Sequence, residues 1–370
     1  MKIVADENIP GLDMFRRHAD VHMLPGREIG RQHLQDADAL ITRSVTQVSG
    51  RLLEGTPVKF VGSCTIGLDH IDIESLQALK IYWVNAPGSN ANSVAEYVLA
   101  CMLALDLPIE TIKVGIVGYG NVGSRLYDLL NTLGIDCVCH DPLLAIECVR
   151  NPVSFAEILD CDVISLHTPL TEQCEFPTKY LFGEMEFQCL KQGAVLINTA
   201  RGAVVDNSAL FEFYMNKNQG ELVTVLDVWE NEPFIHVDLL QNVSIATPHI
   251  AGYSVNGKMA ATKAVYAAFC RYFSLTPVSC SFTDDITLLP ETTRSFQEAI
   301  LSVYNPARDD RLLRQSLLES QKKLTKQERG RKFDALRKHY WQRKEFSNYS
   351  VSAISSESLK ARLLSLGFSE

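Results

Sequence analysis

The sequence predicts an α/β protein with two doubly wound parallel-sheet domains and a further C-terminal α+β domain. Residues 1–90 alternate short apolar runs with helix-like segments, and a second such series begins at Thr111. From Glu291 onward the charge balance changes. That stretch carries 16 Lys and Arg against 10 Asp and Glu, a net charge of +6, and the remainder of the chain carries −15. A chain of 370 residues has room for two or three domains.

The first series contains four expected strands, which helices or turns separate. The expected strands are residues 2–6, 39–44, 59–64 and 81–87, and the connections are residues 9–18, 49–55 and 73–80. Strands joined by such connections are expected to lie parallel in one sheet. A long helix within residues 89–107 should then lead to the second domain.

The second series contains six expected strands. They are residues 112–118, 136–141, 161–168, 193–200, 222–227 and 243–249. A helix over 257–273 should return to the first domain, a linker should follow over 274–290, and the amphipathic stretch 312–346 should be helical. The predicted domains are therefore residues 1–92 with 256–282, residues 93–255, and residues 288–370.

Composition argues against several classes of protein. The net charge of −9 disfavours nucleic acid as the main partner. No apolar run approaches the roughly 18 residues that a membrane span needs, and Asp6 and Glu7 interrupt the N-terminus where a signal peptide would be apolar. The ten cysteines include no CxxC pair, which favours buried thiols in a reducing cytoplasm. No metal site is predicted.

A glycine-rich loop predicts a dinucleotide site. Gly118, Gly120 and Gly123 have G-x-G-x-x-G spacing between an expected strand and an expected helix. Gly118 would permit a tight turn, Gly120 the approach of backbone to a pyrophosphate, and Gly123 close helix–strand packing. The phosphates would then lie at the helix N-terminus, beside Asn121 and Val122.

Asp141 predicts which dinucleotide binds. It ends the next expected strand, 18 residues after Gly123. A carboxylate there would accept hydrogen bonds from a ribose diol and repel a 2′-phosphate, so NAD is favoured over NADP.

Three later strands end in polar residues that suit the oxidation of a 2-hydroxy acid. They lead to Arg201, to the acidic stretch that begins at Asp227, and to His249, and parallel strands bring such ends to one sheet edge. Histidine is a suitable base, a carboxylate can orient it, and arginine can grip a substrate carboxylate. Glu230 and Glu232 both fit the carboxylate role, and the residue pattern alone does not separate them.

These motifs resemble the D-2-hydroxyacid dehydrogenase family. The matching segments are "GIVGYGNVG", "LHTPLT", "INTARGAVVD", "LDVWENEP" and "TPHIAG", within residues 1–280. The resemblance implies a Rossmann NAD domain, a flavodoxin-like substrate domain, and Arg201, Glu232 and His249 as the catalytic residues, with Glu230 left as a solvated loop acid. It also implies that Thr168, Thr199, Ala200, Arg201, Asp227 and Gly252 line the NAD site, with Asp227 facing the nicotinamide side of the cofactor.

The C-terminal region resembles an extension that ordinary family members lack. With the substrate-domain motifs it implies a small phosphorylated 2-hydroxy acid as substrate and a homodimer formed through this region. Ser44, Thr65 and Tyr253 match substrate-contact positions, and Arg43 beside Ser44 could read a phosphate; a salt-bridged Arg43 is the alternative. The basic pairs Arg337–Lys338 and Arg343–Lys344 are predicted to form a solvated helix face, or else one reaches a partner subunit's cleft.

Three other functions fit parts of the sequence. Another D-2-hydroxyacid dehydrogenase, such as one that acts on 3-phosphoglycerate, would lack a reason for the C-terminal region. An NAD-sensing binding module would not need the complete Arg, Glu and His set. A nucleic-acid-binding tail is disfavoured because the basic segment lacks interleaved aromatic residues and a recognisable motif.

Overall fold

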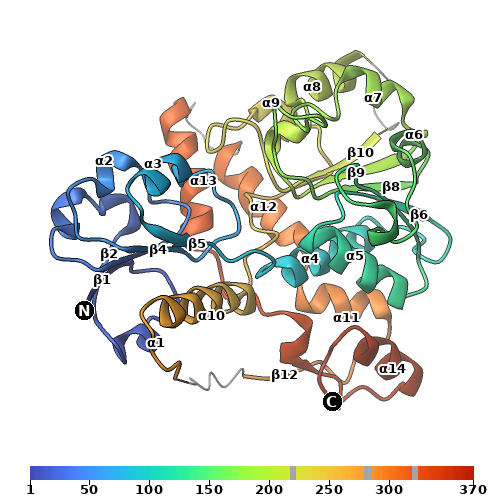
Figure 1. Cartoon of the computed structure of the whole chain (residues 1–370). Coiled ribbons are helices and arrows are strands. Elements are labelled where there is room, and N and C mark those ends of the chain that lie inside the picture. The colour runs from blue at the N-terminus through green and yellow to red at the C-terminus, as the bar shows by residue number, and fades with distance from the viewer. Residues whose placement is uncertain (217–221, 279–284, 319–323) are drawn as a thin grey trace. The chain divides into compact units, whose positions relative to one another are not determined.

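The computed structural model of the chain describes residues 1–216, 222–278, 285–318 and 324–370 (Figure 1). Unit 1 comprises Met1–Asn90 and Ser254–Asp284, and unit 2 comprises Ala91–Tyr253 and Asp285–Glu370. The division into three domains stays a prediction. Residues 279–284 lie outside the described residues; they include residues 279–282 of the first predicted domain and part of the expected linker. Residues 319–323 of the expected helical stretch also lie outside the described residues.

Unit 1 contains a parallel five-stranded sheet with the order β2-β1-β3-β4-β5. Its strands are β1 Lys2–Asp6, β2 Asp20–Leu24, β3 Ala39–Thr42, β4 Phe60–Ser63 and β5 Tyr82–Val84. This order is the flavodoxin-like one, so the predicted class is confirmed. Strand β2 lies outside the predicted strands because it is an edge strand without a buried residue, and its sequence lacks an apolar run.

The long helix α10 packs against this sheet. The helices of unit 1 are α1 Asp13–Arg16, α2 Gly50–Leu53, α3 Ile73–Ala78 and α10 Val255–Tyr272, with the 3-10 turns η1 Gly26–Glu28 and η2 Arg31–Leu34. Ser254 begins α10 by accepting a hydrogen bond from the N–H of Gly257. A Cβ on Gly62 of β4 would lie 2.3 Å from Val265, so glycine permits this close packing. The predicted helix that returns to the first domain is confirmed.

Unit 2 contains a parallel six-stranded sheet with the order β11-β10-β9-β8-β6-β7. Its strands are β6 Lys113–Val117, β7 Asp136–His140, β8 Val163–Leu166, β9 Ala194–Asn198, β10 Leu222–Leu226 and β11 Ile245–Ala246. All six were expected, and the Rossmann-like class is confirmed. Beyond β7, the described chain adds only an isolated parallel bridge between Cys139 and Pro152.

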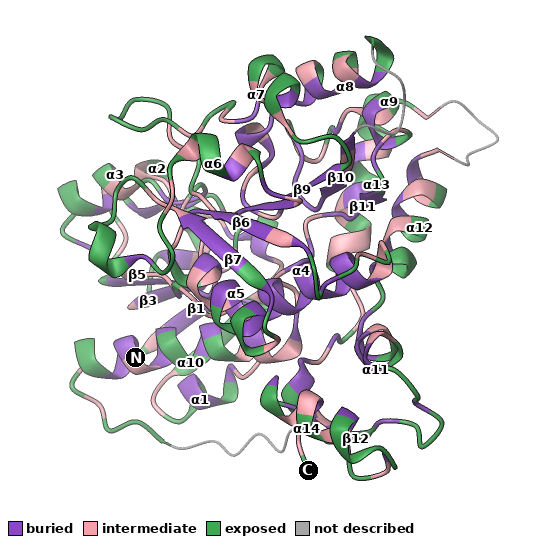
Figure 2. Ribbon diagram, turned by 90° about the vertical axis from the view of Figure 1, so that its right-hand side faces the viewer, coloured by how far each residue is buried: buried purple, intermediate pink, exposed green. Residues whose placement is uncertain are grey.

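Alternate residues of these strands face two separate apolar clusters. Val195 and Ile197 of β9 join one cluster, and Ala194 and Leu196 join the other. Figure 2 shows the buried strands among helices with exposed outer turns. These elements are α4 Ala91–Ala104, α5 Asn121–Thr132, η3 Ile146–Cys148, α6 Phe155–Leu159, α7 Glu184–Cys189, η4 Gly202–Val204, α8 Asn207–Asn216 and α9 Val237–Leu240.

The C-terminal region completes both clusters of unit 2. It consists of β12 Thr287–Leu288, α11 Phe296–Val303, α12 Pro306–Leu317, α13 Lys326–Lys338, η5 Phe346–Asn348, β13 Tyr349–Ser350 and α14 Glu357–Ser365. Ile300 of α11 joins the first cluster, and Leu313 of α12 and Phe333 of α13 join the second. The predicted helix is confirmed for residues 312–317 and 326–338 and is wrong for residues 340–345, which are not helical. None of the helices in the described ranges has the length and apolar character that a membrane crossing needs.

Candidate active site

The glycine loop has the geometry that its spacing predicts. Gly118 has φ +89°, in the region that favours glycine, and its N–H donates to the carbonyl of His140 at 2.8 Å. A Cβ on Gly123 would lie 1.9 Å from the oxygen of Gly118, whereas one on Gly120 would meet no described atom within 4 Å. Among the described side chains none caps the N-terminus of α5. These residues fit a pyrophosphate. The loop is open at Gly120, and the first backbone N–H groups of α5 have no capping side chain among the described residues.

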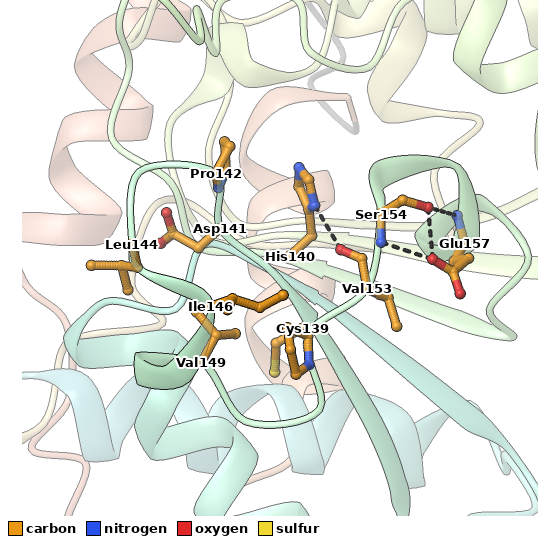
Figure 3. Close-up of a pocket in the computed structure, with 11 residues that line it drawn as sticks. Cys139, His140, Asp141, Pro142, Leu144, Ile146, Val149, Val153, Ser154 and Glu157 are labelled. Carbon is orange, nitrogen blue, oxygen red and sulfur yellow. Dashed lines mark hydrogen bonds between the residues drawn. The ribbon is translucent and has the colours of Figure 1, made fainter.

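Asp141 lies at the end of β7, beside a cavity of about 350 Å³ (Figure 3). Its Oδ2 accepts from the N–H of Tyr119 at 2.8 Å and its Oδ1 from the N–H of Leu143 at 3.1 Å. Leu144 and Ile146, which are exposed, also line this cavity. A carboxylate beside aliphatic walls suits a ribose and its base, and the volume falls in the range of small-molecule sites. The apolar stretch after Asp141 is the signal that could have predicted this wall.

Thr168 and Thr199 follow the neighbouring strands β8 and β9. Oγ1 of Thr168 is buried and has no hydrogen-bond partner within the described part of the chain, so it fits a hydroxyl that binds a ligand. Oγ1 of Thr199 lies 3.2 Å from Nδ1 of His167, and Nε2 of His167 lies 2.9 Å from Oγ of Ser165. Burial lowers the pKa of His167 to about 3. The neutral ring therefore ties the ends of β8 and β9 together.

Arg201 lies in a turn that Asn198 holds. Nδ2 of Asn198 donates to the carbonyl of Arg201, and Oδ1 accepts from the N–H of Ala200, both at 3.0 Å. A Cβ on the next residue, Gly202, would lie 1.9 Å from the carbonyl carbon of Trp229. Glycine at this position therefore lets the Arg201 turn contact the acidic loop after β10. Gly202 was not among the predicted site residues, although "RG" in "NTARG" carries the signal.

Asp227 anchors the loop that carries His249. It is 1% exposed. Its Oδ1 accepts from Oγ1 of Thr247 at 2.6 Å and from the N–H of Ile250 at 2.8 Å, and its Oδ2 accepts from the N–H of Ala251 at 2.9 Å. Its carbonyl accepts from the N–H of His249 at 2.7 Å, and His249 has φ +57°. Asp227 thus fixes an uncommon backbone conformation; its predicted contact with NAD stays a prediction.

His249 and Glu232 form a hydrogen-bonded pair. Nδ1 of His249 lies 2.7 Å from Oε2 of Glu232, and Oε1 of Glu232 accepts from the N–H of Trp229 at 2.8 Å. Burial raises the pKa of Glu232, but the charge of His249, their hydrogen bond and the charge of Arg337 outweigh burial and hold the pKa below its usual range. An ionised Glu232 orients the imidazole, so Nε2 is the nitrogen that can exchange a proton with a ligand.

The other acid of this loop, Glu230, has a structural role. Its Oε2 accepts from the N–H of Asn207 and its Oε1 from the hydroxyl of Tyr180, both at 2.9 Å. The N–H of Glu230 donates to Oδ1 of Asn207 at 3.2 Å. The expectation that Glu230 is a solvated loop acid is therefore wrong, because this half-buried side chain joins the loop to the start of α8.

Two arginines of the C-terminal region lie inside unit 2. NH2 of Arg337 donates to the hydroxyl of Tyr253 at 3.1 Å, and NH1 lies 3.9 Å from Oε2 of Glu232. Arg343 is 1% exposed, and its NH2 donates to the carbonyls of Ser93 and Ala251, both at 2.7 Å. The prediction of a solvated helix face is therefore wrong for both arginines. Both carry long donor-rich side chains that satisfy buried oxygens.

The predicted substrate residues of unit 1 follow β3 and β4. Arg43 pairs with the buried Asp6, with Nε 3.0 Å from Oδ2 and NH2 3.2 Å from Oδ1. Ser44 is exposed in the turn after β3. Thr65 is half-buried after β4, where Oγ1 lies 2.7 Å from Oγ of Ser63. The salt-bridged alternative for Arg43 is thus observed, and phosphate binding stays a prediction.

Curated relatives cover the whole chain. An erythronate-4-phosphate dehydrogenase of Cellvibrio japonicus is 43% identical over 382 residues, which is 100% of this chain and 99% of that protein. One of Saccharophagus degradans is 41% identical over 382 residues with the same coverage. This chain belongs to the erythronate-4-phosphate dehydrogenase family. Residues 100–251 also match the family "D-isomer specific 2-hydroxyacid dehydrogenase, NAD binding domain". The resemblance, the dehydrogenase class and the cofactor NAD are therefore confirmed.

Solved structures match the fold over about three quarters of this chain. The TT0316 protein of Thermus thermophilus is 26% identical, with a TM-score of 0.65, and the match covers 75% of this chain and 98% of that one. NAD⁺-bound 3-phosphoglycerate dehydrogenase of Entamoeba histolytica is 25% identical, with a TM-score of 0.64, and covers 76% of this chain and 99% of that one. Residues 284–367 match a family described only as a domain of unknown function.

Proposed function

We propose that this chain catalyses the NAD-dependent oxidation of 4-phospho-D-erythronate to (R)-3-hydroxy-2-oxo-4-phosphooxybutanoate. The observation that carries the proposal is the Glu232–His249 pair, with 2.7 Å between Oε2 and Nδ1. The strand ends that carry this pair belong to the same sheet edge as the glycine loop. The relatives that cover the whole chain are named for this substrate, which supports the choice among 2-hydroxy acids.

His249 acts as the base in this reaction. Its Nε2 takes the proton of the C2 hydroxyl as the C2 hydrogen departs as hydride, leaving a 2-oxo acid. NAD, when bound, supplies the acceptor for that hydride. Glu232 stabilises the imidazolium that forms. The imidazolium then loses its proton to solvent, which restores the base. Arg201 holds the substrate carboxylate through paired N–H donors and polarises the developing carbonyl.

The residues proposed to hold NAD come from consecutive strand ends of unit 2. Backbone N–H groups of the glycine loop bind the pyrophosphate, and Asp141 accepts hydrogen bonds from the ribose diol. The buried hydroxyl of Thr168 supports a role beside the nicotinamide. The full proposed set is Gly118, Gly120, Asn121, Val122, Gly123, Asp141, Thr168, Thr199, Ala200, Arg201, Asp227 and Gly252.

The residues proposed to bind the substrate are Arg43, Ser44, Thr65 and Tyr253. Arg43, Ser44 and Thr65 follow strands of unit 1, and Tyr253 ends the Ala91–Tyr253 segment of unit 2. Asp6 holds the guanidinium of Arg43, which pre-organises it for an anion.

Assembly, location and pathway belong to the same proposal. We propose a homodimer formed through the C-terminal region and a cytoplasmic enzyme of pyridoxine biosynthesis. The name of the relatives supports the pathway. The nine described cysteines are free thiols, which fits a reducing compartment.

The proposal is tested by following NADH formation with the purified protein. 4-Phosphoerythronate, unphosphorylated erythronate, 3-phosphoglycerate and D-lactate are compared as substrates. We expect the largest kcat/KM with 4-phosphoerythronate. A larger kcat/KM with 3-phosphoglycerate would contradict the proposed substrate and favour 3-phosphoglycerate in its place. NAD binding without turnover of any of these acids would favour an NAD-sensing module instead. Light scattering at several protein concentrations tests the dimer.

A further inference from the structure

Arg337 brings the C-terminal region to the catalytic pair of its own chain. It lies near the end of α13, within the residues that match the domain of unknown function. Its NH1 lies 3.9 Å from Oε2 of Glu232, the oxygen that pairs with Nδ1 of His249, and its NH2 donates to the hydroxyl of Tyr253 at 3.1 Å. One guanidinium therefore reaches both a proposed catalytic carboxylate and a proposed substrate-binding hydroxyl.

The packing of α13 holds this guanidinium in place. A Cβ on Gly330 would lie 2.7 Å from Cε1 of Phe234 and 3.4 Å from Cγ of Pro233, so α13 lies directly on the loop that carries Glu232. The side chain of Arg337 is only 21% exposed. Its Nε is buried without a hydrogen-bond partner among the described residues. The contacts that favour this position are therefore those of NH1 with Glu232 and of NH2 with Tyr253.

We propose that Arg337 is a positioning residue for the reaction, which keeps Glu232 ionised behind His249 and fixes the hydroxyl of Tyr253. The inference rests on the proposed function, in which Glu232 orients the base. It assigns a role to the C-terminal region beyond assembly. The matches to solved structures leave about a quarter of this chain uncovered, although they cover the matched chains almost completely.

The charges around Glu232 give the expected direction. His249 and Arg337 face its carboxylate, the buried Asp227 lies at the start of the same loop, and Tyr253 faces Arg337. The charge of Arg337 is one of the causes that hold the pKa of Glu232 low against burial. Loss of a positive charge favours the protonated form of every neighbouring group. Without Arg337, Glu232 should keep a proton to higher pH.

The test compares Arg337→Gln, Arg337→Lys and Lys338→Gln with the wild-type protein. Lys338 is the exposed neighbour on the same helix, so Lys338→Gln removes an equal charge without the contact. The first readout is the profile of kcat/KM against pH with the best substrate of the panel above. The second is the titration of the Glu232 carboxylate by NMR, assigned with Glu232→Gln, which needs no turnover. The affinity for NAD serves as the control for folding.

We expect Arg337→Gln to move the acidic limb of the profile and the Glu232 titration to higher pH by about one unit, the lower end of what a nearby opposite charge does to a carboxylate. The affinity for NAD should stay within about twofold of the wild type. Arg337→Lys and Lys338→Gln should keep the wild-type profile. If Arg337→Gln does not fold, Arg337→Met replaces it, since Met retains the packing against Tyr253.

A Glu232 titration that coincides in Arg337→Gln and the wild type would overturn the inference, even if activity falls, because a purely structural loss lowers activity at all pH values. An equal shift in Lys338→Gln would overturn it as well. Absence of turnover in the wild-type protein would instead reject the proposed function. The Glu232 titration would still decide the role of Arg337.

Discussion

Nδ1 of His249 lies 2.7 Å from Oε2 of Glu232, although 17 positions separate the two residues in sequence. Three contacts create this pair. Asp227 fixes the backbone of the His249 loop, the N–H of Trp229 holds the other oxygen of Glu232, and Gly202 lets the Arg201 turn contact Trp229. The proposed acid–base pair is therefore a product of three strand ends that hold one another.

Replacement of the pair should separate the two acids of the loop. His249→Ala should lower kcat by about 10²–10⁴-fold, because the positioned base is lost. Glu232→Gln should lower kcat by roughly 10²-fold, since the amide cannot stabilise the imidazolium. Steady-state kinetics and NAD affinity measure both effects. Glu230→Gln is the matched control. It should lower the thermal stability of the protein and should lower kcat less than Glu232→Gln does. A loss of kcat in Glu230→Gln that equals that in Glu232→Gln would contradict the assignment.

Gly202→Ala should disrupt the contact between the Arg201 turn and the acidic loop. The added Cβ would lie 1.9 Å from the backbone of Trp229, a distance that no side-chain rotation can relieve. We expect at least about a 100-fold loss of kcat/KM, because a displacement of about 1 Å at a reacting group can cost that much. Gly183→Ala is the control, since its nearest contact is 3.6 Å. Similar kinetics for the two variants would show that the close approach is dispensable.

Asp141→Ala should change the choice of cofactor. Loss of the carboxylate removes an acceptor for the ribose diol and the repulsion of a 2′-phosphate. The ratio of kcat/KM with NAD to that with NADP should fall by at least about 10-fold, the equivalent of one charged hydrogen bond of about 1.4 kcal/mol. Asp136→Ala, at the exposed start of the same strand, should leave the ratio unchanged. An unchanged ratio in Asp141→Ala would place the ribose elsewhere.

Glu96 should make stability depend on pH. Nδ2 of Asn92 donates to its Oε1 at 2.7 Å and to Oε2 of Glu345 at 2.8 Å. Burial, then the charge of Glu345, raises the pKa of Glu96 from 4.5 to about 8. Between these values the folded state binds a proton that the unfolded state has released, so the free energy of unfolding falls as pH rises, by up to about 1.4 kcal/mol per pH unit.

Glu96→Gln removes this titration. Denaturation at several pH values between about 5 and 8 should show its stability rising relative to the wild type as pH increases. Glu147→Gln, at an exposed position, should follow the wild type throughout. Parallel pH dependence of Glu96→Gln and the wild type would mean that Glu96 is already ionised in the folded protein.

Most of the fold could be predicted because its signals are local. All six strands of unit 2 contain apolar runs, and the spacing of Gly118, Gly120 and Gly123 identifies the turn, the open position and the packing position that the structure contains. Strand β2 escaped prediction because an exposed edge strand needs no apolar run. The candidate Arg, Glu and His residues could be named, since parallel strands bring their ends to one edge.

The sequence by itself therefore determined the two parallel sheets, the NAD loop and the set of polar strand ends. The tertiary structure decided which acid pairs with His249, gave Glu230 to the start of α8, and gave Asp227 the task of anchoring the His249 loop. It also buried Arg343 and turned Arg337 toward Glu232, where the sequence predicted a solvated face. These outcomes depend on contacts between segments up to about 250 residues apart, such as that of Arg343 with Ser93. Local periodicity and spacing carry no information about such contacts, because burial and partner are set only when the segments pack together.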